Sequence, residues 1–296
     1  MNAPHLKATR DALSSVGMTA PEWKGAVTGS FEVGGRRLEY RWIGPPPGEA
    51  PTIVFLHEGL GSAGLWRDFP DRVAAESGCG ALLYSRAGHG GSSPATGPRS
   101  VQYLHDESLE VLPAVLARFG LAHVVLFGHS DGASMAILFA GTHPGSVRAM
   151  VLEAPHVFVE PVTVEGVREI AGEYETSRLP ERLGRHHGAN ADPLFRAWAG
   201  VWLSPEFRTW NIEGHLSTIA CPVLVIQGED DRYGTVRQVE AIVRQVHGPA
   251  STLVLPGCGH SPHAERPEPV LDAAAGFIRR ALEDSAPDPE PAGGVP

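Results

Sequence analysis

Short apolar strands alternate with helical segments along most of this chain, and this order restricts the fold more than any other feature. Buried strands are predicted at 52–57, 81–85, 123–128 and 147–154, and helical spacing separates them at 62–77, 101–119 and 130–143. An alternating hairpin, 31–33 and 38–43, precedes them, with Gly34 and Gly35 at its turn. Strand, helix and strand in repeated order build a parallel sheet with helices on both faces.

The alternation stops after Pro155 and resumes with the strand 222–228, which is followed by a helix, a strand and a last helix at 268–282. The intervening stretch is more charged and has irregular helical patches. We therefore predict one α/β core formed by 26–154 and 221–283, with 155–220 inserted as a helical cap. Residues 1–25 are expected to be a poorly ordered segment, and the proline- and acid-rich residues 284–296 a disordered tail.

The stretch "VVLFGHSDGASMA" (124–136) places Ser130 between Gly128 and Gly132, directly after a predicted strand and before a helix. A strand that turns sharply into a helix leaves no room for β-carbons near the corner, and glycines relieve this crowding. The corner would expose the hydroxyl of Ser130 at a helix N-terminus, where backbone N–H groups favour developing negative charge. The pattern predicts a nucleophile.

A serine hydroxyl needs a base to accept its proton and an anion to orient that base. Both residue types follow later strands directly, and the carboxyl ends of parallel strands share one edge of the sheet. His260 follows one strand, with His263 as a rival base. Candidate acids are Asp231 and its neighbour Asp230 after another strand, and Glu153 at the end of an earlier one.

At this point the chain resembles the α/β-hydrolase superfamily, in its capped branch that includes epoxide hydrolases and C–C hydrolases. The resemblance runs from about residue 31 to 282 and rests on "HEGLGS", "SRAGHGGSS", "GHSDGA", "QGEDD" and "GCGHSPHAERPE". It implies a mostly parallel eight-stranded sheet with flanking helices and an inserted helical cap. It also implies Ser130 as nucleophile, His260 as base and Asp231 as acid, with the backbone amides of Gly59 and Asp131 forming the oxyanion hole.

The chain departs from that family's usual pattern at three places. Serine at position 130, where covalent epoxide and halide chemistry uses aspartate, argues against those reactions. Glu58 follows the loop histidine where glycine is usual, so a carboxylate is expected near the oxyanion hole. Ser85 and Ala87 stand where the family carries aspartate and arginine, so an ion pair there is expected to be missing or rerouted through Arg86.

The sequence predicts a serine hydrolase of small carboxylic esters or related acyl compounds. The alternatives are cleavage of a carbon–carbon bond beside a carbonyl, cofactor-free perhydrolysis, and ligand binding without turnover. The five large aromatic side chains of the insertion are expected either to pack the cap or to wall the substrate pocket: Phe195, Trp198, Trp202, Phe207 and Trp210. The side chain of Asp131 is expected to face solvent or the cap.

Composition excludes several other classes of protein. The formal net charge is −10 with scattered basic residues, which argues against nucleic acid as a partner. The 14 histidines form no metal-ligand motif, so we expect neither a metal nor a cofactor, only a small-molecule substrate. Three cysteines without zinc-like spacing, no secretory signal and no membrane-spanning run favour a cytoplasmic monomer or homodimer.

Overall fold

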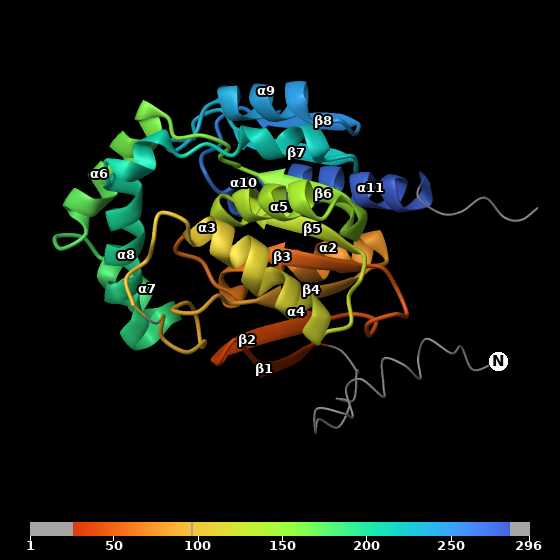
Figure 1. Ribbon diagram of the computed structural model, residues 1–296, viewed down its shortest axis with the longest axis horizontal. Coiled ribbons are helices and arrows are strands. Elements are labelled where there is room, and N and C mark those ends of the chain that lie inside the picture. Colours follow the sequence, from red (N-terminus) through yellow and green to blue (C-terminus); the bar gives the residue numbers. More distant parts are fainter. Residues whose placement is uncertain (1–25, 96, 285–296) are drawn as a thin grey trace, which may run out of the picture.

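The computed structural model describes residues 26–95 and 97–284, so the expectations for 1–25 and 285–296 lie outside the described residues. One eight-stranded sheet crosses the molecule in the order β1-β2-β4-β3-β5-β6-β7-β8 (Figure 1). Its strands are β1 (Val27–Val33), β2 (Arg36–Ile43), β3 (Thr52–Leu56), β4 (Gly80–Tyr84), β5 (Val124–His129), β6 (Val147–Glu153), β7 (Val223–Gly228) and β8 (Ala250–Leu255). Strand β2 is the one strand that runs opposite to the other seven, which confirms the predicted mostly parallel sheet.

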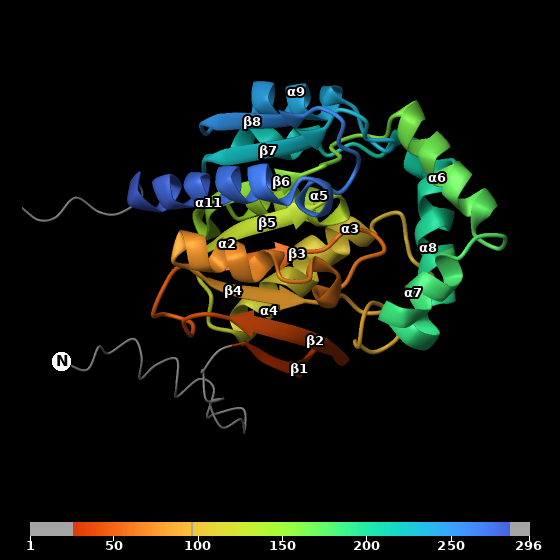
Figure 2. The same ribbon diagram turned by 180° about the vertical axis from the view of Figure 1, so that it is seen from behind.

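The central strands are apolar because both of their faces are covered. Every residue of β3, β4 and β5 is buried, as expected for a parallel sheet between two helical layers. Helices α2 and α11 pack on one face, as Figure 2 shows, while α4, α5 and α9 pack on the other. The bounds of these helices are α2 (Phe69–Ser77), α4 (Leu112–Arg118), α5 (Asp131–Thr142), α9 (Val236–Gln245) and α11 (Pro267–Asp284).

Two of the predicted helices are interrupted. The segment predicted as one helix at 62–77 forms a short 3-10 turn, η1 (Ala63–Trp66), and then α2. The two are separated at Arg67, whose φ of 54° is incompatible with a right-handed helix. The segment predicted at 101–119 contains α3 (Tyr103–Asp106), a π-helical turn η2 (Glu107–Val111) and α4. The hydrophobic spacing predicted the buried face but not these local changes in winding.

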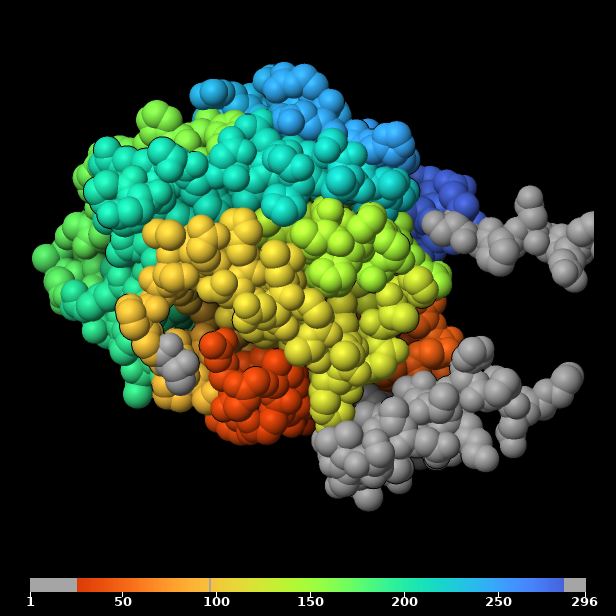
Figure 3. Space-filling view, in the orientation of Figure 1, coloured from red at the N-terminus to blue at the C-terminus, as the bar shows by residue number. Residues whose placement is uncertain are grey.

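The residues between β6 and β7 form a helical layer beside one end of the core, seen in green and teal in Figure 3. Its helices are α6 (Pro161–Glu173), α7 (Leu179–His187) and α8 (Ala191–Leu203), followed by the 3-10 turns η5 (Glu206–Thr209) and η6 (Glu213–Thr218). Smaller elements complete the fold: η3 (Pro144–Ser146), η4 (Gly188–Asn190) and α10 (Pro262–Glu265). No helix in the described ranges is both long and apolar enough to cross a membrane.

Candidate active site

Ser130 occupies the corner between β5 and α5 in a strained backbone conformation. Its φ is 54° and its ψ −115°, a region that residues with a β-carbon rarely adopt. A β-carbon on Gly128 would overlap the backbone of Gly132, and one on Gly132 would overlap the carbonyl of Leu56. The two glycines therefore let β3, β5 and α5 approach closely enough to form the corner that the sequence predicts.

The three side chains predicted to act together lie in series. Nε2 of His260 is 2.9 Å from Oγ of Ser130, and Nδ1 of His260 is 2.9 and 2.8 Å from the two carboxylate oxygens of Asp231. The geometry fixes the tautomer, because a carboxylate can only accept: Nδ1 carries the proton and Nε2 is free to accept one from Ser130. Each residue lies at or just beyond the carboxyl end of a different strand.

The surroundings of Asp231 keep it ionised. Burial alone would raise the pKa of this carboxyl, but the charge and hydrogen bond of His260 and the amide of Tyr233 outweigh burial and lower the pKa to about 2. The side-chain amide of Gln227 donates a further hydrogen bond at 2.8 Å. The neighbouring Asp230, the alternative acid, is exposed, and among the described residues the carboxylate hydrogen-bonded to His260 is that of Asp231.

The other two alternatives, Glu153 and His263, pair with each other. Nδ1 of His263 lies 2.9 Å from both carboxylate oxygens of Glu153, and its backbone N–H donates to the same carboxylate at 2.6 Å. This buried pair anchors the loop that carries His260. His129 holds the same loop, because its Nε2 donates to the carbonyl of His260 at 2.7 Å.

The side chains of His129, Glu153 and His263 also form a possible metal-ligand group within the described residues, with one ligand atom of each within 4.8 Å of the others. Hydrogen bonds already use Nε2 of His129, Nδ1 of His263 and both oxygens of Glu153. These bonds account for the closeness of the three side chains.

Arg86 orients the predicted oxyanion loop from behind. Its Nη2 donates to the carbonyl of Glu58 at 2.7 Å, and that carbonyl also accepts from Nδ1 of His57 at 2.8 Å. In a trans peptide the C=O and the next N–H point in opposite directions. The N–H of Gly59 is therefore directed away from Arg86. Burial and the adjacent Arg86 charge hold the pKa of His57 well below its usual range, so His57 stays neutral.

The second predicted donor, the amide of Asp131, is the first N–H of α5 and has no partner within the helix. The carbonyl of Ser130 accepts from the N–H groups of Ala133 and Ser134 at 2.9 and 3.0 Å, so it points along the helix. The same trans-peptide argument directs the N–H of Asp131 out of the helix end.

The side chain of Asp131 does not face solvent, so that part of the expectation was wrong. Only 1% of the residue is exposed. Oδ2 accepts a hydrogen bond from the phenol of Tyr103 at 2.8 Å and lies 3.5 Å from Nη1 of Arg86. Arg86 thus takes part in an ion pair, as expected from the altered motif, and its partner is the residue beside the candidate nucleophile. Tyr103 gave no sequence signal beyond helical spacing.

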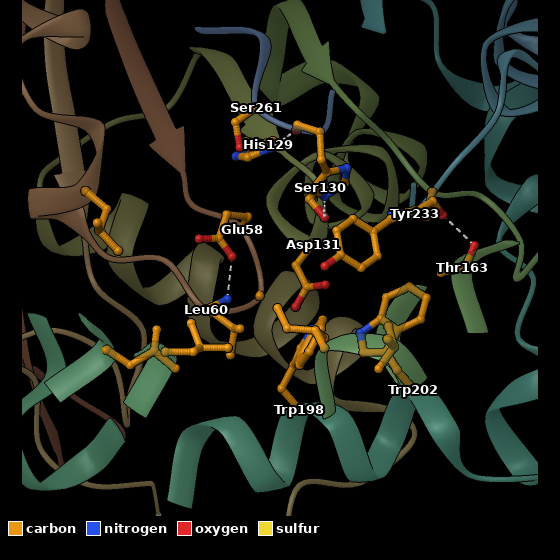
Figure 4. A pocket seen from close by; sticks show the side chains of 18 of the residues that line it. Glu58, Leu60, His129, Ser130, Asp131, Thr163, Trp198, Trp202, Tyr233 and Ser261 are labelled. Carbon is orange, nitrogen blue, oxygen red and sulfur yellow. Dashed lines mark hydrogen bonds between the residues drawn. The ribbon is translucent and has the colours of Figure 1, made fainter. Parts of the chain in front are cut away.

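A cavity of about 340 Å³ opens over Ser130, between the core and the cap helices (Figure 4). Of the five cap aromatics, Trp198 and Trp202 line it, while Phe195, Phe207 and Trp210 are buried outside it. The ring of Tyr233 also lines the cavity and packs edge-on against His260, with ring centres 4.8 Å apart. A β-carbon at Gly59 would overlap the indole nitrogen of Trp198, so glycine is required where the cap meets the oxyanion loop.

Glu58 lies in the wall between this cavity and a second one of about 450 Å³, lined partly by Trp66 and His263. One oxygen of Glu58 accepts from the amide of Leu60, which folds the side chain back onto its own loop. Burial raises the pKa of Glu58, and the nearby charge of Asp131 adds to this effect. The carboxylate expected near the oxyanion hole is therefore present.

A serine at a strand-to-helix corner, backed by histidine and aspartate from later strands of a mostly parallel sheet, defines an α/β-hydrolase. The family model described as "Alpha/beta hydrolase family" matches residues 53–273, about three quarters of the sequence. The chain belongs to this family.

Individual relatives agree with this assignment. A 2-hydroxy-6-oxononadienedioate/2-hydroxy-6-oxononatrienedioate hydrolase of Paraburkholderia phymatum is 30% identical over 252 residues, covering 73% of this chain and 83% of that protein. A probable lysophospholipase of Arabidopsis thaliana, BODYGUARD 1, is 31% identical over 123 residues, which cover 40% of this chain and only 26% of that protein.

Solved structures give the same fold. The alpha/beta hydrolase MGS-M2, from a deep-sea metagenome library of the Medee basin, superposes with a TM-score of 0.69. The match covers 88% of this chain and 100% of that one. With 19% identity, this similarity establishes the fold alone.

Proposed function

We propose that this protein is a serine hydrolase that cleaves a small carboxylic ester, or a related acyl compound, through an acyl-enzyme intermediate. The observation that carries the proposal is the continuous hydrogen-bonded series from Ser130 through His260 to Asp231, with 2.9 Å between hydroxyl and imidazole. Nucleophile and base at this distance are the arrangement that acyl transfer requires. The series opens into a cavity large enough for a small substrate.

In the first step Ser130 Oγ attacks the carbonyl carbon and its proton passes to Nε2 of His260. The resulting imidazolium is stabilised by Asp231, and it protonates the leaving alcohol as the ester bond breaks. Water then attacks the acyl-enzyme with His260 again acting as base, which releases the acid and restores the serine. The amides of Gly59 and Asp131 would stabilise the tetrahedral oxyanion, and one such donor contributes about 3 kcal/mol.

The test of this proposal is labelling by a fluorophosphonate, which reacts with an activated serine. Wild-type protein is expected to acquire one probe per chain, and Ser130→Ala none, with intact mass measured by mass spectrometry. Circular dichroism of the variant checks that its fold is retained. An unlabelled but folded wild type, or equal labelling of the alanine variant, would contradict the proposal.

A second candidate reaction uses the same three side chains to hydrolyse a carbon–carbon bond beside a carbonyl. Its support is the similarity to the Paraburkholderia phymatum hydrolase, whose name gives a 2-hydroxy-6-oxo dienedioate as substrate. Turnover of a vinylogous 1,5-diketone acid faster than of phenyl esters would favour this reaction. The reverse ranking would favour ester hydrolysis.

The pH dependence of kcat/KM is expected to report His260. Burial alone would lower the pKa of this imidazole, but the charge and hydrogen bond of Asp231 reverse the effect and raise the pKa above 6.5. Activity should therefore fall as the pH drops through this raised pKa, because protonated His260 cannot accept the serine proton. The variant Asp231→Asn removes the charge that raises the pKa of His260, so the acid limb of the profile should move to lower pH while the maximum rate falls.

The measurement is kcat/KM for an uncharged ester between about pH 5 and 9. The matched control is Asp230→Asn, which removes a carboxylate charge from the exposed residue next to Asp231. The control should leave the acid limb where it is in the wild type. An acid limb that stays in place in Asp231→Asn would argue against His260 as the base.

A further inference from the structure

The carboxylate of Asp131 has one oxygen engaged and one free. Oδ2 accepts from Tyr103 and faces Arg86, whereas Oδ1 has no hydrogen-bond partner among the described residues. Asp131 lines the 340 Å³ cavity, and Figure 4 shows its carboxylate pointing into the space between Ser130 and Trp198. A carboxylate oxygen that faces a cavity and has no donor from the protein can accept a hydrogen bond from the occupant.

The groups around this oxygen favour a cation. Glu58 supplies a second carboxyl group to the same cavity, and the rings of Trp198, Trp202 and Tyr233 form part of its wall. Aromatic faces attract ammonium groups, and this attraction strengthens when water is excluded.

The arginines whose charge acts on Asp131 do not line the cavity. Arg86 lies 3.5 Å from Asp131 but divides its donors between that carboxylate and the carbonyls of His57 and Glu58. Arg182, which does line the cavity, belongs to cap helix α7 and is exposed to solvent. Arg86 and the partly buried Arg99, whose charge also acts on Asp131, are absent from the cavity lining, so the cavity side of Asp131 is left for a group of the occupant.

The position of Asp131 also identifies which part of the substrate meets it. Its amide is one of the two proposed oxyanion donors, so the substrate carbonyl oxygen would lie beside this residue. The leaving group lies beside His260, which protonates it. Figure 4 places the carboxylate of Asp131 on the opposite side of Ser130 from His129 and Ser261, the residue that follows His260. The acyl group, and in particular the substituent on its α-carbon, would then reach Oδ1.

We propose that the natural acyl group carries a protonated amine on its α-carbon, bound by Oδ1 of Asp131 and covered by Trp198. This inference rests on the proposed function and specifies the substrate class of that site as esters, or related acyl derivatives, of α-amino acids. The reaction itself is unchanged: the acyl–oxygen bond breaks, His260 returns the proton to the alcohol, and the free amino acid is released by water.

Three phenyl esters of equal shape test the inference: phenyl alaninate, phenyl lactate and phenyl isobutyrate carry an ammonium, a hydroxyl and a methyl group on the same carbon. Rates are measured at about pH 6.5, where an α-amine is mostly protonated, and the Ser130→Ala rate is subtracted as background. Each kcat/KM is then divided by the rate constant of the same ester for hydrolysis by hydroxide, because an ammonium or hydroxyl group on the α-carbon itself activates the carbonyl, and the ratios below are of these normalised values. Wild type is expected to have a kcat/KM for the alaninate about 10- to 100-fold above that for the isobutyrate, the range of a charge-assisted hydrogen bond. The lactate should fall between them.

In Asp131→Asn, which keeps the backbone amide but removes the charge, the alaninate-to-isobutyrate ratio should fall to near one. Asp230→Asn removes a charge from an exposed neighbour of the catalytic acid and should keep the wild-type ratio. Equal wild-type rates on alaninate and isobutyrate would overturn the inference while leaving the serine hydrolase intact, and so would a preference that survives in Asp131→Asn. Hydrolysis of all three esters by Ser130→Ala at the wild-type rate would instead refute the proposed function.

Discussion

The variant His260→Ala is expected to lower kcat for ester hydrolysis by about 10⁵- to 10⁶-fold, the loss found when the base of a Ser-His-Asp triad is removed. Without the imidazole, Ser130 has no group within hydrogen-bonding distance that can take its proton, because His260 Nε2 at 2.9 Å is the one side-chain partner of its hydroxyl among the described residues. The cavity and the oxyanion amides remain, so binding should suffer far less than turnover.

The matched comparison for this variant is His263→Asn. Asparagine keeps an N–H donor for Glu153 and so preserves part of the contact that anchors the loop. Its kcat should fall by less than about tenfold, since His263 orders the loop and does not contact Ser130. Stopped-flow measurement of acylation with a chromogenic ester gives both values. A larger loss of kcat in His263→Asn than in His260→Ala would mean that His263, and not His260, is the base.

Replacing Arg86 with methionine is expected to destabilise the fold by about 3–5 kcal/mol, the usual effect of removing one partner from a buried charge pair. Arg86 is 2% exposed, and its loss would leave the carboxylate of Asp131 without its counter-charge and the carbonyls of His57 and Glu58 without a guanidinium donor. Because the carbonyl of Glu58 would no longer be held, the N–H of Gly59 should also lose its fixed direction, and kcat should fall with stability.

Urea unfolding measures the loss in stability, with Arg168→Met as the control. Arg168 forms an ion pair with Glu165 on the surface of α6, and such exposed pairs contribute less than about 1 kcal/mol. Arg86→Lys should recover part of the stability, since it restores the charge but not the several donors of the guanidinium. Similar unfolding midpoints for Arg86→Met and Arg168→Met would contradict the role given to Arg86.

The meeting of Ser130, Asp231 and His260 at one edge could be predicted from chain order, and the resemblance to the family selected Asp231 and His260 among the candidates. Parallel strands bring their carboxyl ends to one edge, so residues that directly follow β5, β7 and β8 meet there whatever the intervening helices look like. The same rule brings Glu153 and His263 to that edge. The sequence offered these two as rivals for acid and base, and only the structure shows that they bind each other rather than Ser130.

The surroundings of Asp131 could not be predicted, because they depend on side-chain packing between distant segments. Tyr103 and Arg86 reach its carboxylate from 28 and 45 residues away, and neither contact leaves a periodic signal. The cap aromatics illustrate the same limit. Trp198 and Trp202 are four residues apart and so share a face of α8, but the sequence does not state whether that face meets the cavity or the cap interior.

The phenol of Tyr103 has a consequence for how the cap and core act on each other. Its oxygen donates to Asp131 and accepts from the indole N–H of Trp202 on α8 at 3.0 Å. Any displacement of α8 that breaks the indole contact weakens the polarisation of the phenol, and with it the hydrogen bond to the carboxylate next to Ser130. The position of α8 and the hydrogen bonding of the carboxylate beside Ser130 are thus linked through one tyrosine.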